Sequence, residues 1–171
     1  MTKDPKAPPS KSHGRKAIRP TLKPRELITP TPDLAGVWKA KVLTLFPGAF
    51  PGVLGESLTG KALQEGLWQL EASDLRQFGL TKHRNVDDTP AGGGAGMVLR
   101  PDVLGNAIEH AMADTTTAPQ GGNWPLIYLS PRGRRMDQAM MQSLARCDGM
   151  TLLCGRFEGV DERVLDHYNI Q

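Results

Sequence analysis

The chain has 171 residues, of which 39% are hydrophobic and 23% charged, a balance typical of about one soluble globular domain. Its apolar runs are far shorter than the roughly 18 residues of a membrane-spanning helix, and no apolar secretion signal follows the first lysine. We therefore expect a cytoplasmic protein without a membrane partner. Cys147 and Cys154 have the spacing of neither a redox pair nor a zinc knuckle, so we expect ordinary thiols.

Charge is distributed unevenly along the chain. Residues 1–35 hold eight Lys or Arg and three Asp or Glu, a local charge of +5 that leaves −2 for the remainder of the +3 total. The same segment carries seven of the fourteen prolines and few large apolar side chains. It cannot bury enough surface to offset the entropy of ordering, which predicts a disordered basic extension, either a solvated leader or an RNA contact. The folded domain is predicted at residues 36–171.

Hydrophobic periodicity then predicts alternating strands and helices. Expected strands lie at 38–46, 67–72, 97–99, 125–129 and 150–154, and expected helices at 50–66, 101–111, 136–145 and 160–167. Pro101 suits the first turn of the second helix, and Gly66 suits the end of the first. This order predicts an α/β fold with a mostly parallel sheet and helices on both faces.

A long polar segment, residues 74–96, interrupts the alternation. It contains Lys82, His83, Arg84, Asp87 and Asp88 and then the glycine run Gly92, Gly93, Gly94 and Gly96. Glycines in this number are expected where main chain approaches a ligand or must move, although a solvated surface loop remains the alternative. A metal site at the two aspartates is a weaker hypothesis, because no third ligand is evident nearby, and we predict no bound metal.

Two predicted strand ends carry the most informative residues. Tyr128-Leu129-Ser130-Pro131 closes one strand, and Cys154-Gly155-Arg156-Phe157-Glu158-Gly159 closes the next. Because right-handed crossovers place both ends at one edge of the sheet, we expect them to form two walls of one crevice. Glu158 stands between two glycines, where it can accept hydrogen bonds from N–H donors of a flat ligand. Asp161, Glu162 and Arg163 are interpreted as a helix cap with ion pairs.

Two nucleotide-binding patterns are rejected. Residues 55–62 nearly match G-x-x-x-x-G-K-[ST], but Ala62 replaces the hydroxyl and the glycines lie in a helical pattern. The glycine run at 92–96 lacks the third glycine of G-x-G-x-x-G.

With these residues in place, the sequence resembles the bacterial tRNA (guanine-N1)-methyltransferases of the SPOUT superfamily. The resemblance is carried by Leu-Phe-Pro at 45–47, His-Arg-x-Val-Asp-Asp at 83–88, Gly-Gly-Gly-x-Gly-Met at 92–97, Ile-Tyr-Leu-Ser-Pro-x-Gly at 127–133 and Leu-x-Cys-Gly-Arg-x-Glu-Gly-x-Asp-Glu-Arg-Val at 152–164. Ala91, Ala95 and Phe157 depart from the family pattern, which has Tyr, Pro and Tyr there.

The resemblance implies a trefoil-knot domain that binds S-adenosylmethionine, acts on tRNA as a homodimer, and methylates N1 of the guanine 3′ of the anticodon. The residues implied at the adenosine pocket are Tyr128, Leu129, Ser130, Pro131 and Gly155. Glu158 and Gly159 are implied beside the methyl donor and the guanine, with Arg156 as a supporting cation. The substrate cleft is implied along His83, Arg84, Asp87, Asp88, Gly92, Gly93, Gly94 and Gly96.

The family's general-base aspartate and tRNA-gripping helical domain have no match before Gln171. We therefore expect a fragment of a longer product, and expect that the 171-residue chain alone does not methylate tRNA. An inactive remnant that binds RNA or a partner is the first alternative. A generic Rossmann-like domain that binds NAD or ATP is the second.

Overall fold

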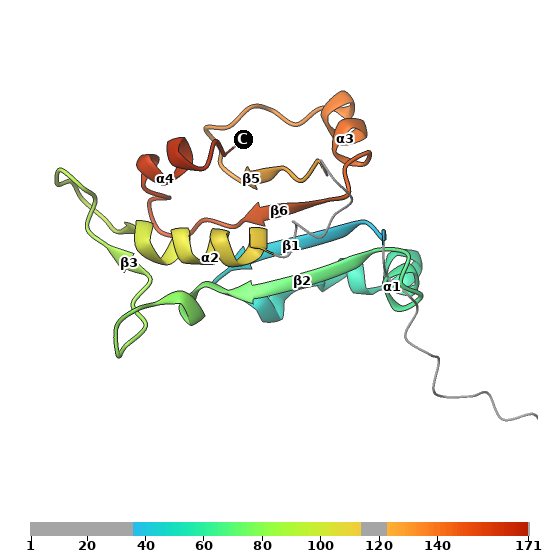
Figure 1. The fold of residues 1–171 in the computed structure, drawn as a ribbon, viewed down its shortest axis with the longest axis horizontal. Helices are drawn as coiled ribbons and strands as arrows, with labels where there is room; N and C mark the ends of the chain where they lie inside the picture. Colours follow the sequence, from blue (N-terminus) through green and yellow to red (C-terminus); the bar gives the residue numbers. More distant parts are fainter. Residues whose placement is uncertain (1–35, 114–122, 171) are drawn as a thin grey trace, which may run out of the picture. The chain divides into compact units, whose positions relative to one another are not determined.

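Four parallel strands form the main sheet of the computed structural model, which describes residues 36–113 and 123–170 (Figure 1). The strands are β1 (Lys39–Thr44), β2 (Gln69–Asp74), β5 (Leu126–Tyr128) and β6 (Gly149–Leu153), in the order β2-β1-β6-β5. All three neighbouring pairs are parallel, which confirms the predicted α/β class. The basic extension predicted at 1–35 lies outside the described residues.

The central strand β1 is buried on both faces. Val42 and Leu43 are adjacent in β1 and therefore point to opposite faces, yet each is only 1% exposed. Leu153 in β6 is fully buried. Residues 40–44 of β1 are all buried, so both faces of this strand are covered, whereas β6 alternates between buried and half-buried positions.

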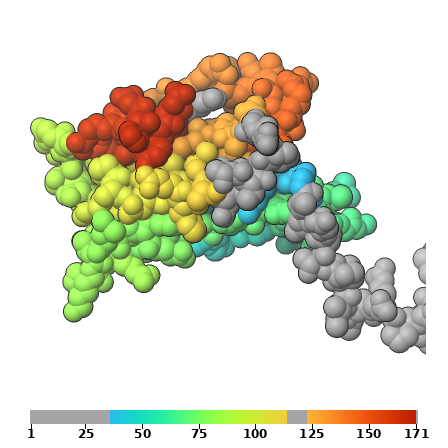
Figure 2. All heavy atoms as spheres, in the orientation of Figure 1, coloured from blue at the N-terminus to red at the C-terminus, as the bar shows by residue number. Residues whose placement is uncertain are grey.

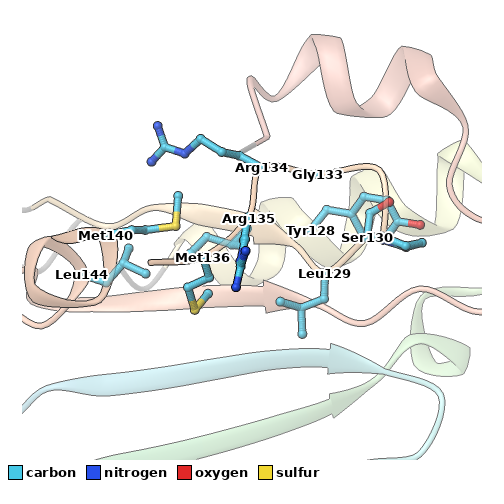
Figure 3. Close-up of a pocket in the computed structure, with 11 residues that line it drawn as sticks. Tyr128, Leu129, Ser130, Gly133, Arg134, Arg135, Met136, Met140 and Leu144 are labelled. Atoms are coloured by element: carbon cyan, nitrogen blue, oxygen red, sulfur yellow. The ribbon is translucent and has the colours of Figure 1, made fainter. Parts of the chain in front are cut away.

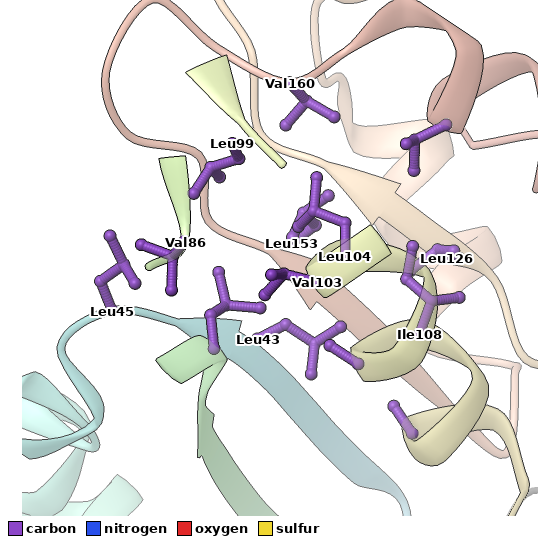
Figure 4. Packing of buried hydrophobic residues seen from close by; sticks show 14 residues of the cluster. Leu43, Leu45, Val86, Leu99, Val103, Leu104, Ile108, Leu126, Leu153 and Val160 are labelled. Carbon is purple, nitrogen blue, oxygen red and sulfur yellow. The ribbon is translucent and has the colours of Figure 1, made fainter. Parts of the chain in front are cut away.

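The helix α2 (Pro101–Ala113) covers one face of this sheet and completes the core (Figures 1 and 4). Val103, Leu104, Ala107, Ile108 and Ala111 are its buried positions, at the spacing predicted for one helix face. They pack in one cluster with Leu43, Leu126 and Leu153 from the sheet. The buried Lys41 donates from Nζ to the carbonyl oxygen of Ala111 at 2.6 Å, which places its charge at the carboxyl end of the helix.

The predicted helix at 50–66 was wrong in its first half. Two short 3₁₀ turns, Pro47–Ala49 and Gly52–Gly55, precede α1, which spans only Ser57–Gln64. Pro51 fixes its own φ and Gly52 has φ +56°, a combination that no regular helix contains. Val53 and Leu58, which belonged to the predicted apolar face, are 86% and 82% exposed.

The segment 74–96 contains more regular structure than its composition predicts. A 3₁₀ turn, Leu75–Phe78, buries Leu75 completely, and the strand β3 (Asp87–Asp88) pairs antiparallel with β4 (Val98–Leu99). Buried Val86 and Leu99 anchor this ribbon to the core. Two exposed excursions, at 79–85 and 89–97, extend from it (Figure 1).

Aspartates begin the last two helices. Asp137 accepts from the Met140 amide at 2.8 Å before α3 (Gln138–Leu144), and Asp161 accepts from the Arg163 amide at 3.0 Å before α4 (Glu162–His167). The cap predicted at Asp161 is therefore confirmed. The helix α4 lies alongside α2 on one side of the molecule (Figure 2).

Candidate functional site

The carboxyl ends of β5 and β6 lie side by side at one edge of the sheet. Tyr128 is in register with Leu153, and the Leu129 amide extends the pairing by donating to the Leu153 carbonyl oxygen at 3.2 Å. The segments that begin at Ser130 and Gly155 therefore leave the sheet as neighbours, as the sequence predicted.

A cavity of about 850 Å³ opens beside the β5 exit (Figure 3). This β5 pocket is lined by Ile127, Tyr128, Leu129, Ser130, Pro131, Gly133, Arg134, Arg135, Met136, Met140 and Leu144. Its wall is mainly apolar, because α3 contributes Met140 and Leu144. Arg135 lies near Met136 and Leu129, whereas Arg134 extends away from them (Figure 3). The four residues predicted from Tyr128 to Pro131 thus share one cavity.

The two glycines of the β6 exit receive the ring of Tyr128. A Cβ atom on Gly155 would lie 2.7 Å from Cε2 and 2.9 Å from Oη of Tyr128, and one on Gly159 would lie 3.3 Å from Oη. Gly155 is not among the residues that line the β5 pocket. The predicted wall of bare main chain at Gly155 is therefore covered by the Tyr128 side chain, which needs the glycine to lie so close.

Glu158 lines a second hollow, of about 580 Å³. This Glu158 hollow is lined by Pro90, Ala91, Val98, Arg132, Glu158, Val160, Asp161, Glu162 and Arg163. Two main-chain hydrogen bonds join the β6 exit to residues 97–99: the Glu158 amide donates to the Met97 carbonyl oxygen at 2.9 Å, and the Leu99 amide donates to the Gly159 carbonyl oxygen at 3.0 Å. The end of the glycine run and the predicted carboxylate are thus held together.

Most charges around the Glu158 hollow are paired. Arg132 binds Glu162, and the Arg163 guanidinium binds both carboxylate oxygens of Asp161 at 2.9 and 2.6 Å. The hydrogen bond from Arg163 lowers the pKa of Asp161 below its usual range, although partial burial acts in the opposite direction. Glu158 has no ion-pair partner in the described part of the chain, so its exposed carboxylate is available to a ligand.

Arg156 points to a different partner. Its guanidinium carbon lies 5.3 Å from the ring centre of Phe46, and that of Arg76 lies 5.9 Å from the same ring. Arg76 also donates to the Leu45 carbonyl oxygen at 2.6 Å. Arg156 is therefore held at the end of β1 and lines neither the β5 pocket nor the Glu158 hollow.

The predicted substrate-cleft residues divide into three groups. His83 and Arg84 are exposed on the excursion at 79–85, where the Arg84 amide closes a turn on Thr81, and they line neither cavity. Asp87 and Asp88 form β3, and Oδ2 of Asp88 lies 4.0 Å from Nη1 of Arg100. The excursion at 89–97 carries Gly92, Gly93 and Gly94 and brings Gly96 against Glu158.

Residue-by-residue reasoning missed the arginines that follow β5. Arg132 borders the Glu158 hollow, while Arg134 and Arg135 line the β5 pocket. Three arginines within four residues directly after a buried parallel strand were the available signal, because ligands gather at such strand ends.

Within 36–113 and 123–170, no group of three His, Cys, Asp or Glu side chains is arranged as metal ligands. None of the helices in these ranges has both the length and the hydropathy that crossing a membrane requires.

The fold is similar to that of a solved RNA-modifying enzyme. The crystal structure of tRNA (m1G37) methyltransferase from Aquifex aeolicus matches 76% of this chain and 56% of its own, with a TM-score of 0.63 and 31% sequence identity. The strand-end cavities thus occur in an α/β fold of the SPOUT methyltransferase class.

Sequence comparison narrows the class to one family. Residues 38–171 match the family model described as tRNA (Guanine-1)-methyltransferase TrmD, and the chain belongs to this family. It is 82% identical over 141 residues to a tRNA (guanine-N(1)-)-methyltransferase of Ruegeria sp. strain TM1040, and 78% identical over 144 residues to that of Ruegeria pomeroyi. These matches cover 82% and 84% of this chain but 56% and 57% of the relatives.

Proposed function

We propose that this chain provides the methyl-donor site of an S-adenosylmethionine-dependent tRNA (guanine-N1)-methyltransferase that modifies the guanine 3′ of the anticodon. The observation that carries the proposal is the β5 pocket, which opens at the carboxyl end of β5, beside the end of β6, and is lined by Tyr128, Leu129, Ser130 and Pro131. Family membership and the likeness to the Aquifex aeolicus enzyme support the same reaction.

The pocket suits a nucleoside in size and in chemistry. Its volume of about 850 Å³ falls in the range of small-molecule sites, and Leu129, Met136 and Met140 offer apolar surface to a flat base. Main-chain groups at Ser130 and Pro131 supply polar contacts to the base edge. Gly155 and Gly159 act here by leaving space for the Tyr128 ring, which lines the β5 pocket.

Glu158 is placed to handle the target guanine. S-adenosylmethionine supplies a methyl group on a sulfonium, and guanine N1 must lose its proton when it takes that methyl. A carboxylate that accepts from the guanine N–H groups orients the base, and a cation or N–H donor at O6 stabilises the negative charge that develops as N1 loses its proton. Arg156 is the proposed donor to O6, for which it must leave the Phe46 ring. The family's general-base aspartate has no match in residues 1–171.

The proposed RNA path runs over the two excursions. His83 and Arg84 supply positive charge, Asp87 and Asp88 fix the ribbon at its base, and Gly92, Gly93 and Gly94 let the chain approach the tRNA closely. A second copy of the chain is proposed to cover exposed apolar side chains, among them Phe46, Val53, Leu54 and Leu58.

The test is a methyl-transfer assay with the complete gene product, tritiated S-adenosylmethionine and two tRNA transcripts. One transcript has guanine 3′ of the anticodon and the other has adenine there. We expect label only in the first transcript, as 1-methylguanosine after digestion. Equal labelling of both transcripts would overturn the assigned specificity. RNA binding without any transfer would favour the non-catalytic alternative, and binding of NAD or ATP instead of S-adenosylmethionine would favour the generic nucleotide-binding one.

A further inference from the structure

The last glycine of the run, Gly96, is in contact with the side chain of Glu158. A Cβ atom on Gly96 would overlap Cγ of Glu158 and would lie 3.2 Å from both its Cδ and its Oε1. The other glycines of the run differ: a Cβ on Gly92 or Gly93 would meet nothing within 4 Å, and one on Gly94 only the Pro90 ring at 3.9 Å. Gly96 is therefore the member of this run whose missing side chain leaves room for the carboxylate.

The main chain fixes this contact on both sides. The Glu158 amide donates to the carbonyl oxygen of Met97, the residue after Gly96, and Leu99 pairs with Gly159 and forms a parallel bridge to Val160. Leu99 and Val160 are both buried in the core. The backbone of Glu158 is thus anchored, and a group inserted at Gly96 would displace the side chain instead.

We propose that Gly96 is a positioning residue for the Glu158 carboxylate in the methyl-transfer reaction proposed above. The absence of a side chain at Gly96 lets the carboxylate lie against the end of the glycine excursion. Because the proposed RNA path runs over that excursion, a bound tRNA would position the glycine run and the Glu158 carboxylate together. The inference rests on the proposed function only for the catalytic consequence. The contact itself is independent of it.

The first experiment measures the position of the carboxylate without any reaction. In the 171-residue chain labelled with [¹³Cδ]glutamate, the Glu158 signal is assigned by its loss in Glu158→Gln. We expect this signal to shift in Gly96→Ala. Gly92→Ala is the matched control, since both glycines have φ +88° and alanine is equally strained there, while only Gly96 has Glu158 beside it. A Glu158 signal that stays in place in Gly96→Ala, or moves equally in both variants, would overturn the proposal.

The second experiment measures catalysis in the complete gene product. Gly96→Ala is expected to lower kcat for the guanine transcript at least about tenfold with a KM for tRNA close to that of the parent, as for loss of an aligned catalytic carboxylate. Gly36→Ala is the control for backbone strain, because Gly36 has φ +78° and open space around its Cβ position. An unchanged kcat in Gly96→Ala would overturn the positioning role. A shifted carboxylate signal together with no transfer by the parent protein would refute the proposed function and leave the contact standing.

Discussion

The two strand exits at the functional edge are built differently. After β5, the chain turns away from the sheet and leaves a wide, mainly apolar cavity that α3 closes on one side. After β6, the chain is paired by two main-chain hydrogen bonds, one to Met97 at the end of the glycine excursion and one to Leu99 in β4, and a capped helix follows. An open exit suits binding, and a fixed exit suits the placement of one carboxylate, so we propose that the neighbouring strand ends divide these two tasks.

The largest effect that would sharpen this comparison is expected at Glu158. Replacing it with Gln removes the negative charge that is proposed to accept from guanine N–H groups, and methyl transfer by the complete gene product should fall about 100-fold. Glu65→Gln is the control, because Glu65 is exposed and pairs with Lys61 at 3.6 Å, away from both cavities. Near-parental activity in Glu158→Gln would show that the fixed exit positions no reactive group.

The contact between the two exits is tested at Gly155. Alanine there would push the Tyr128 ring away and distort the β5 pocket, so we expect affinity for S-adenosylhomocysteine to fall about tenfold in calorimetry. Gly48→Ala, at a site with nothing within 4 Å of its Cβ position, should leave the affinity unchanged. If both variants bind equally well, Tyr128 does not shape the pocket.

Two adjacent methionines in α3 allow a residue that lines the β5 pocket to be compared with one that does not. Met140 lines the β5 pocket and Met141 is 43% exposed outside it. Truncating Met140 to Ala removes apolar pocket surface that the ligand is expected to contact, so S-adenosylhomocysteine binding should weaken about fivefold. Met141→Ala should have little effect. The reverse ranking would place the ligand on another face of α3.

The smallest effect is expected at the cap of α4. Asp161→Ala should lower the free energy of unfolding by about 1 kcal/mol at pH 7, because it removes the cap and the Arg163 pair. The folded state lowers the pKa of Asp161, so the charged part of this contribution is complete above the ordinary aspartate pKa of about 3.9 and is lost as the pH falls below it.

Urea unfolding between pH 7 and pH 2.5 measures this, and Asp161→Asn is the control that keeps the cap and removes the charge. The difference between the parent and Asp161→Asn should shrink as the pH falls. A difference that grows toward low pH would contradict the assigned pKa shift.

The strands were predictable from the sequence, and the fine placement of side chains was not. Runs such as Val42-Leu43 and the buried face of α2 follow from hydrophobic periodicity, and parallel order places Ser130 and Gly155 at one edge. The spacing of apolar residues does not show where a helix is interrupted. The first helix is therefore shorter than predicted, because Pro51 and Gly52 cannot belong to it.

The sequence did not predict those features of the site that depend on packing between residues far apart in the chain. That Tyr128 lies on Gly155 and that Arg156 stacks on Phe46 depend on contacts across separate strands, which spacing along the chain does not encode. The knot, the homodimer and the roles of the predicted site residues stay predictions.

The most direct test of the division between the two exits is amide chemical-shift mapping of the ¹⁵N-labelled complete gene product during titration with S-adenosylhomocysteine. We expect the largest shifts at Leu129 and Ser130, with smaller shifts at Gly155. Shifts confined to the opposite ends of the strands, near Lys39 and Gly149, would contradict the assignment of the methyl-donor site.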